Sequence, residues 1–288
     1  MFRFGVDSLI WTEDFSQKDV PLIAKAKDLG FEVIDINIRR PETFPLAEVK
    51  DALKNVEMQA VTTIGLPAEC NLIDTDQSVR RHGVTILKKL VDINMEIGSQ
   101  ILGGVIYAAW GYLSGACRTD QEWQWSLECM REVAEYAKSQ GDLTLAVEPV
   151  NRFESHFLNI ADDAVRYCHE VGTGNVKVHL DSFHMIREEA DFSEAVRVCG
   201  KDYLGYIHAC ENNRGIPGTG LVPWKEFFSA LVDVGYDGPL VIESFDPGFE
   251  ELNRLCAIWR KFADTGEELA VKGLDNLKRI AAEVPQIQ

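Results

Sequence analysis

Four short hydrophobic segments in the second half of the chain each end with a side chain that can bind a metal ion. They span residues 145–148, 178–181, 206–208 and 241–243, and each is followed by loop-like residues and then by a helical pattern. In a barrel of alternating strands and helices, the carboxyl ends of the parallel strands converge on one face. We therefore expect the four terminal side chains to meet around one ion, namely Glu148, Asp181, His208 and Glu243.

These four side chains form an oxygen-rich ligand set of three carboxylates and one imidazole. Such a set suits Mn²⁺, Mg²⁺ or Co²⁺ better than the sulfur-rich or purely tetrahedral arrangement of zinc sites. We expect one divalent ion, Mn²⁺, with Co²⁺ or Mg²⁺ as alternatives. A single glutamate at a strand end is usually solvated or a cap, and a single histidine is more often a core residue. The metal interpretation therefore depends on all four groups occurring at successive strand ends.

Three further polar residues follow the proposed ligands at short spacing. Glu154, His184 and Arg214 lie on predicted loops just beyond strand ends, where barrel enzymes hold their substrates. His184 and Arg214 could donate to a carbonyl and its adjacent hydroxyl, while Glu154 could accept from a hydroxyl or orient His184. Arg214, like Arg152, could instead form a surface ion pair with a nearby glutamate. The turn-rich loop 214–220 could close over a small ligand.

The hydrophobic pattern indicates the elements that must position these residues. Near-continuous apolar runs typical of buried parallel strands occur at 2–9, 31–38, 58–65, 100–106, 143–149, 176–181, 204–209 and 239–244. Helical patterns lie at 18–29, 46–55, 76–97, 120–140, 160–171, 192–200 and 223–235. Several of these patterns are followed by a glycine, as helix ends prefer. The alternation predicts eight strand-helix units.

The fold class that follows is α/β, with residues 1–288 forming a single (β/α)₈ TIM barrel. A helical tail at 249–284 is expected to begin as the eighth barrel helix and to finish as an extra C-terminal segment. No linker or low-complexity tract divides the chain. The glycine-rich phosphate-binding motifs that would favour an open doubly wound sheet do not follow the first strand.

Composition and charge limit the kinds of partner and the location that we expect for the protein. A net charge of −17 and a pI near 4.8 would repel a phosphate backbone, so we expect no nucleic-acid partner. No window reaches about 18 uninterrupted apolar residues, and charge interrupts the amino terminus early, so we expect a cytoplasmic protein without a membrane span. The seven cysteines lack short paired spacing, which favours reduced thiols, including core positions at Cys129, Cys168, Cys199 and Cys256.

The segments that carry the candidate site resemble one family, the ketose 3-epimerases, which include D-tagatose 3-epimerase and D-psicose 3-epimerase in the xylose-isomerase-like barrel superfamily. The matching segments are 147–154, 179–185, 208–220 and 242–245. The resemblance implies that the four proposed ligands hold a metal ion, with Glu154, His184 and Arg214 binding the C1–C3 end of a ketose. Trp110 and Phe245 match positions that form an apolar wall in the family.

The resemblance runs over nearly the whole chain but is specific only from about residue 143 to 245. In the first half, segments 64–67 and 108–109 differ from the better-known sugar epimerases. These differences concern the identity of the sugar more than the reaction. The family also implies a small-molecule sugar substrate and a homodimer or homotetramer.

The implied reaction is epimerisation at C3 of a free ketose through a metal-bound cis-enediolate. A hydrogen next to a ketone is weakly acidic, so a divalent ion bound to the C2 carbonyl and C3 hydroxyl would stabilise the enediolate. If Glu148 and Glu243 enter from opposite sides, one removes the C3 proton and the other returns a proton to the opposite face. These two glutamates are the expected catalytic residues.

Other functions use a similar barrel. An aldose-ketose or hydroxypyruvate-type isomerase, or an epimerase of sugar acids or sugar phosphates, could use the same metal site. A phosphodiester-cleaving enzyme like endonuclease IV would need histidines at the ends of the third and fourth strands, and the sequence has none there. A catalytically silent sugar-binding protein would be expected to have lost one of the two glutamates, and both are present.

Overall fold

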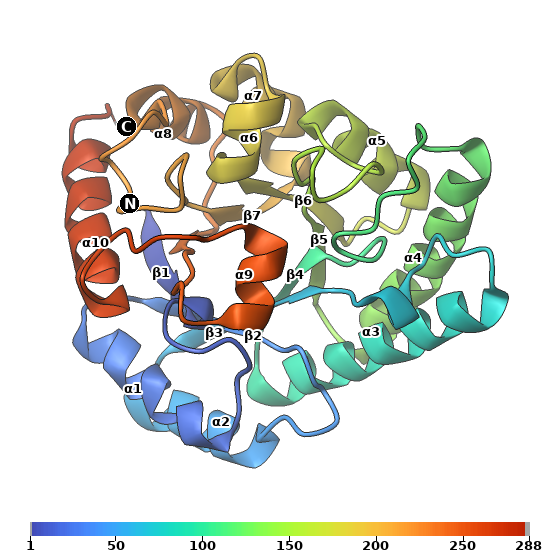
Figure 1. Cartoon of the computed structure of the whole chain (residues 1–288), viewed down its shortest axis with the longest axis horizontal. Helices are drawn as coiled ribbons and strands as arrows, with labels where there is room; N and C mark the ends of the chain where they lie inside the picture. Colours follow the sequence, from blue (N-terminus) through green and yellow to red (C-terminus); the bar gives the residue numbers. More distant parts are fainter. Residues whose placement is uncertain (1, 286–288) are drawn as a thin grey trace.

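Eight parallel strands close into a barrel in the computed structural model, which describes residues 2–285 (Figure 1). Each strand pairs with its neighbours in sequence, and β1 pairs with β8 to close the ring. The strands are β1 (Arg3–Asp7), β2 (Val33–Asn37), β3 (Gln59–Gly65), β4 (Ile101–Val105), β5 (Thr144–Val147), β6 (Val176–Asp181), β7 (Leu204–His208) and β8 (Pro239–Ile242). The predicted (β/α)₈ barrel is therefore confirmed, and every predicted strand contains an observed one.

Helices surround the barrel in the expected order. The ring consists of α1 (Pro21–Asp28), α2 (Leu46–Val56), α3 (Gln77–Ile97), α4 (Asp120–Gln140), α5 (Ala161–Val171), α7 (Phe192–Tyr203), α8 (Trp224–Asp233) and α10 (Gly266–Ala282). Local sequence sets their ends: Thr119 and Glu122 form a capping box at the start of α4, and Gly172, with a φ of 76°, ends α5.

Two short helices differ from the predicted pattern. The loop expected after β6 is instead α6 (Ser182–Glu188), which the side chain of Asp181 caps by accepting from the Phe183 backbone N–H. In the tail, the extra element comes first, as α9 (Glu250–Cys256), and α10 then completes the helical ring. The predicted order was thus reversed, because α10 is the element that packs against α8 and β8. The remaining short turns are η1 (Ser8–Ile10), η2 (Gln17–Asp19) and η3 (Ala68–Cys70).

The barrel interior is filled by apolar side chains at one end and lined by polar side chains at the other. A buried cluster plugs the interior with Val33, Val61, Ala146, Tyr206 and Val241. A larger apolar core joins the outer faces of the strands to the helices. Above the plug, the inward side chains become polar toward the carboxyl ends of the strands. The fold therefore supports a polar site at one face, where α9 crosses the front of the barrel in Figure 1.

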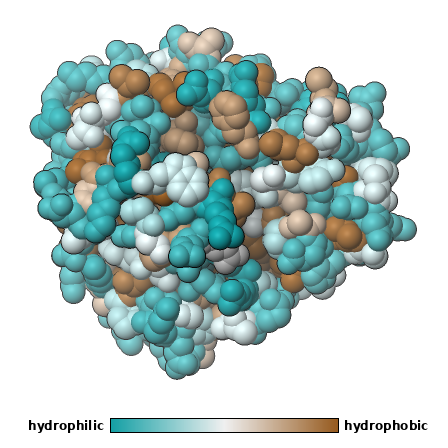
Figure 2. Space-filling view, in the orientation of Figure 1, coloured by the Kyte–Doolittle hydropathy of each residue, from teal (hydrophilic) through white to brown (hydrophobic). Residues whose placement is uncertain are grey.

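The surface of the protein is mainly hydrophilic, and its cysteines are unpaired. Figure 2, drawn from the same side, shows hydrophobic groups scattered among predominantly hydrophilic side chains. Among the described helices, none has the length and apolar character to span a bilayer. All seven cysteines are free thiols, as predicted, although Cys256 is only partly buried and is not a core residue like Cys129, Cys168 and Cys199.

Candidate metal centre and active-site pocket

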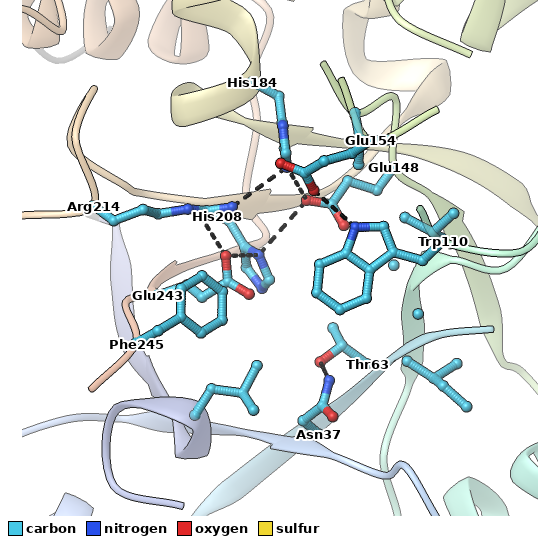
Figure 3. A pocket seen from close by; sticks show the side chains of 16 residues that line it. Asn37, Thr63, Trp110, Glu148, Glu154, His184, His208, Arg214, Glu243 and Phe245 are labelled. Atoms are coloured by element: carbon cyan, nitrogen blue, oxygen red, sulfur yellow. Dashed lines mark hydrogen bonds and ion pairs between the residues drawn. The ribbon is translucent and has the colours of Figure 1, made fainter. Parts of the chain in front are cut away.

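The four proposed ligands converge at the carboxyl end of the barrel, as Figure 3 shows for three of them. Asp181 and His208 are the last residues of β6 and β7, while Glu148 and Glu243 directly follow β5 and β8. All four are at most 8% exposed. His208 Nδ1 lies 3.4 Å from Glu243 Oε2 and 3.9 Å from Glu148 Oε1. One ligand atom from each of Asp181, His208 and Glu243 falls within a 4.8 Å span, a separation that one shared cation could bridge.

The orientation of His208 fits a metal ligand. Its Nε2 lies 3.1 Å from Asp35 Oδ2, and because a carboxylate accepts, Nε2 carries the donated proton. The other ring nitrogen, Nδ1, is buried and has no hydrogen-bond partner among the described residues. A carboxylate that fixes the outer nitrogen of a metal-binding histidine leaves the inner lone pair directed at the ion. The residues present therefore fit a divalent metal.

Arg214 lies among these carboxylates and is 4% exposed, so the surface ion pair considered from sequence does not form. Its Nη1 donates to Asp181 Oδ2 at 2.7 Å and also contacts Glu243 Oε2. The guanidinium stacks 4.1 Å above the Phe183 ring, and the residue has a left-handed φ of 60°. A buried cluster of three carboxylates requires positive charge, and Arg214 supplies part of it.

His184 presents a donor toward the same cluster from α6. Its Nδ1 accepts from the Asn151 backbone N–H at 3.1 Å, which fixes the proton of a neutral ring on Nε2. That Nε2 lies 3.7 Å from both Glu148 Oε1 and Asp181 Oδ2. Burial lowers the pKa of His184, so the neutral tautomer with an N–H facing the pocket is favoured.

Glu154 connects His184 to the pocket wall. Its Oε1 accepts from Asn151 Nδ2 at 2.8 Å, and its Oε2 accepts from Trp110 Nε1 at 2.7 Å. Asn151 in turn contacts His184, so Glu154 orients that ring through an intermediate amide. Trp110 packs so closely over Gly65 that a Cβ there would lie 2.7 Å from the indole. The glycine is therefore needed for the indole to form this wall.

These side chains line one cavity of about 410 Å³. Glu148, Glu154, His184, His208, Arg214 and Glu243 lie together on the side nearest β5–β8, as Figure 3 shows. Trp110 and Phe245 are the aromatic walls expected from sequence, and Leu9 adds an aliphatic one. Asp181 is 1% exposed and does not line the cavity itself. Its Oδ2 accepts a hydrogen bond from the guanidinium of Arg214, which does line the cavity. Every residue predicted for the site is thus placed at one centre.

Burial and the neighbouring charges shift the pKa values of the two glutamates in opposite directions. Burial raises the pKa of Glu148, reinforced by the nearby Asp181 and Glu243 carboxylates. Burial also opposes ionisation of Glu243, but the positive charges of Arg214 and His208 outweigh it and hold its pKa well below the ordinary value. The surroundings of the two carboxyl groups thus shift their pKa values in opposite directions.

His208 is also perturbed. Burial would lower its pKa, yet Glu243, Asp35 and Glu148 together raise it well above the usual value. A metal ion that binds Nδ1 therefore competes with a proton for this ring.

Sequence reasoning missed several supporting residues. Asp35 is fully buried, and its position inside the apolar run of β2 was a signal that could have identified it. Asn151 lies inside a segment already selected, but a neutral amide gave no sign of its bridging role. Cys210 Sγ lies 2.8 Å from Arg214 Nη1, which nothing in the sequence indicated. Arg152, in contrast, forms the predicted surface ion pair, at 2.8 Å from Glu188.

Comparisons with known proteins give a consistent result. Residues 23–280 match the family model described as xylose isomerase-like TIM barrel. The L-ribulose 3-epimerase of Mesorhizobium japonicum is 34% identical over 90% of this chain and 88% of its own length. The D-psicose 3-epimerase of Agrobacterium fabrum is 30% identical over 90% of both chains. A solved D-allulose 3-epimerase from Methylomonas sp., in complex with D-allulose, matches with a TM-score of 0.92 and 31% identity over 96% of both chains.

Proposed function

The chain belongs to the xylose isomerase-like TIM barrel family, and on that premise we propose that it is an isomerase that inverts C3 of a free ketose. The observation that carries the proposal is a pair of buried glutamates, Glu148 and Glu243, that line the same cavity from different strands of the ring. Glu148 follows β5 and Glu243 follows β8, so they enter the site from well-separated points around the ring. Inversion at one carbon requires such a pair, one acting on each face.

One divalent ion would be held by Glu148, Asp181, His208 and Glu243, and we propose Mn²⁺, with Co²⁺ or Mg²⁺ as alternatives. When bound, the ion would polarise the C2 carbonyl and stabilise the negative charge that develops during proton removal. The oxygen-rich donor set and the unpartnered His208 Nδ1 support this assignment.

The proton transfers are made by the chain's own carboxylates. In one direction, the ionised Glu243 takes the C3 proton, and the electron pair of the broken C–H bond moves into the C2–C3 bond and the carbonyl oxygen. Protonated Glu148 then gives its proton to the opposite face of C3, and the carbonyl re-forms. The reaction ends with Glu243 protonated and Glu148 ionised, which is the starting state for the reverse direction.

The remaining polar residues position the sugar. His184 Nε2–H and the Arg214 guanidinium are donors facing the site, suited to the oxygens on C1 to C3. Glu154 holds His184 through Asn151 and can also accept from a substrate hydroxyl. Trp110 and Phe245 cover the reacting carbons and exclude water, which strengthens every electrostatic contact inside.

The test is to incubate Mn²⁺-loaded protein with D-fructose, D-tagatose, D-ribulose and L-ribulose in deuterated water and to follow products by NMR. The proposal expects deuterium at C3 together with the C3 epimer, and loss of both with a chelator. Label at C1 with aldose formation would instead establish an aldose-ketose isomerase. If no free sugar exchanges, sugar acids and sugar phosphates become the substrates to assay.

A further inference from the structure

A pair of neutral polar side chains lies across the cavity from the metal centre. Asn37 ends β2 and Thr63 lies within β3, and both line the same cavity as Glu148 and Glu243. Figure 3 shows them on the opposite side from His184, with the amide and hydroxyl joined by a hydrogen bond. The mechanism above uses neither residue.

The amide is anchored by a chain of buried hydrogen bonds. Asn37 Nδ2 donates to Thr63 Oγ1 at 3.3 Å, and Thr63 Oγ1 donates to Asp35 Oδ1 at 3.0 Å. The other oxygen of Asp35 accepts from Tyr206 and from the proposed ligand His208. The Asn37 backbone N–H is fixed as well, because it donates to Ser8 Oγ at 3.1 Å. One buried carboxylate thus orients both the metal centre and the amide.

More hydrogen-bonding capacity remains on Asn37 than on Thr63. The Thr63 hydroxyl donates its one hydrogen bond to Asp35 and accepts one from Asn37, so a single lone pair remains on its oxygen. The Asn37 amide uses one N–H in that contact, which leaves one N–H and the carbonyl oxygen. A donor and an acceptor held side by side match a hydroxyl, which both donates and accepts.

The charge around the cavity also selects against a phosphate. Arg214 is the single cationic arginine or lysine among the described lining residues, and Asp181 and Glu243 already pair with it. A phosphate group would require an additional cation or several N–H donors. The far side of the cavity offers a neutral amide instead.

We propose that Asn37 is a specificity-determining residue that hydrogen-bonds a hydroxyl on C4, C5 or C6 of the substrate. The inference rests on the proposed function, since it assumes that C1 to C3 of a ketose lie at the metal centre. A site built to pair with a hydroxyl discriminates against an analogue that lacks it, because the protein's polar group is then left unpaired. One uncharged hydrogen bond corresponds to about a tenfold preference.

The test compares D-psicose with its 4-, 5- and 6-deoxy analogues in Mn²⁺-loaded protein. Two quantities are measured for each sugar: kcat/KM, and the dissociation constant from quenching of tryptophan fluorescence. We expect the wild-type protein to prefer D-psicose over one analogue by about tenfold in both. Asn37→Leu, which has a similar volume and no amide, should reduce that ratio to near one. Thr63→Val, which removes the anchor, should reduce it partly.

Thr62→Val is the matched control. Thr62 is adjacent in β3 but donates to Asn94 on the outer side of the barrel at 2.9 Å, so its loss should lower stability and leave the ratio unchanged. A ratio that persists in Asn37→Leu, or a wild-type protein that prefers D-psicose over none of the analogues, overturns the inference. Preferential binding that depends on Asn37, without turnover of any sugar, would overturn the epimerase proposal alone.

Discussion

The two halves of the barrel rim contribute different kinds of side chain to one cavity. The ends of β5 to β8 supply Glu148, Asp181, His208 and Glu243, which are buried and titratable. The ends of β1 to β4 supply neutral groups to the same cavity, including Leu9, Asn37, Gly65 and Val105. Changes in the second half should therefore remove the reaction, and changes in the first half should alter which sugar is used.

The largest effect is expected at the second half of the rim. Glu243→Gln removes the ionised base and preserves the shape of the side chain, so kcat should fall by at least about 10³-fold, or about 4 kcal/mol. Steady-state kinetics on the best ketose gives the comparison. Glu188→Gln is the control, because it removes a buried carboxylate on α6 whose partner is the surface residue Arg152. Equal losses of kcat in both variants would refute the assignment of Glu243 to the catalytic site and of Glu188 to a purely structural role.

Metal binding to the ligands at the ends of β5 to β8 should stabilise the fold. At a Mn²⁺ concentration of about 100 times the dissociation constant, the free energy of unfolding should rise by about 2.7 kcal/mol. Thermal unfolding with Mn²⁺ and with a chelator measures this difference. His208→Ala should abolish the difference, whereas Asn37→Leu should preserve it. An equal metal response in His208→Ala and wild type would exclude His208 as a ligand.

The raised pKa of His208 gives the metal affinity a definite pH dependence. Below that pKa the imidazole is protonated, so binding must release a proton and the affinity should rise by up to about tenfold per pH unit as pH increases. Calorimetry between pH 6 and 8, in two buffers of different ionisation enthalpy, would count the protons. A constant affinity over that range would contradict the assigned ligands.

A smaller effect is expected in the first half. Trp110→Phe keeps an aromatic wall but removes the N–H that Glu154 accepts, so the KM for the sugar should rise by about fivefold with a smaller change in kcat. A fall in kcat of the size seen for Glu243→Gln would show that the wall takes part in the chemistry. Kinetics across the sugar panel decides between these outcomes.

The smallest effect is expected outside the rim. Glu132 on α4 pairs with Arg81 and Lys88, and its pKa is lowered to about 2, mainly by the hydrogen bonds from these two side chains. Because the pairs are partly exposed, Glu132→Gln should cost about 0.5 kcal/mol at neutral pH with unchanged kinetics. A lowered folded-state pKa stabilises above the unfolded pKa, so this difference should vanish as pH falls from about 4.5 toward 2. Urea unfolding at pH 7 and pH 3 measures it.

The sequence predicted the charged half of the site better than the neutral half. Glu148, Asp181, His208 and Glu243 each end an apolar run, and the barrel topology converts that common position into proximity. Asn37 also ends a strand, yet an asparagine there is as typical of a turn as of a pocket. Its role depends on the hydrogen bonds to Thr63 and Asp35, which involve three-dimensional contacts that no periodic pattern encodes.

Helix boundaries show a similar limit. The long helices α3 and α4 follow clear periodic patterns and occur where predicted. The seven-residue α6 is too short for its periodicity to register, so His184 was assigned to a loop. The order of α9 and α10 depends on which helix packs against α8, a tertiary contact. The homo-oligomeric state and the cytoplasmic location remain predictions.

The central claim is that Glu148 and Glu243 act on opposite faces of C3. The most direct measurement follows deuterium incorporation at C3 of each purified C3 epimer, in deuterated water, with Glu148→Gln and with Glu243→Gln. We predict that neither variant interconverts the epimers and that each labels only one of them, a different epimer in each case. Continued interconversion by either variant, or labelling of the same epimer by both, would contradict the two-glutamate mechanism.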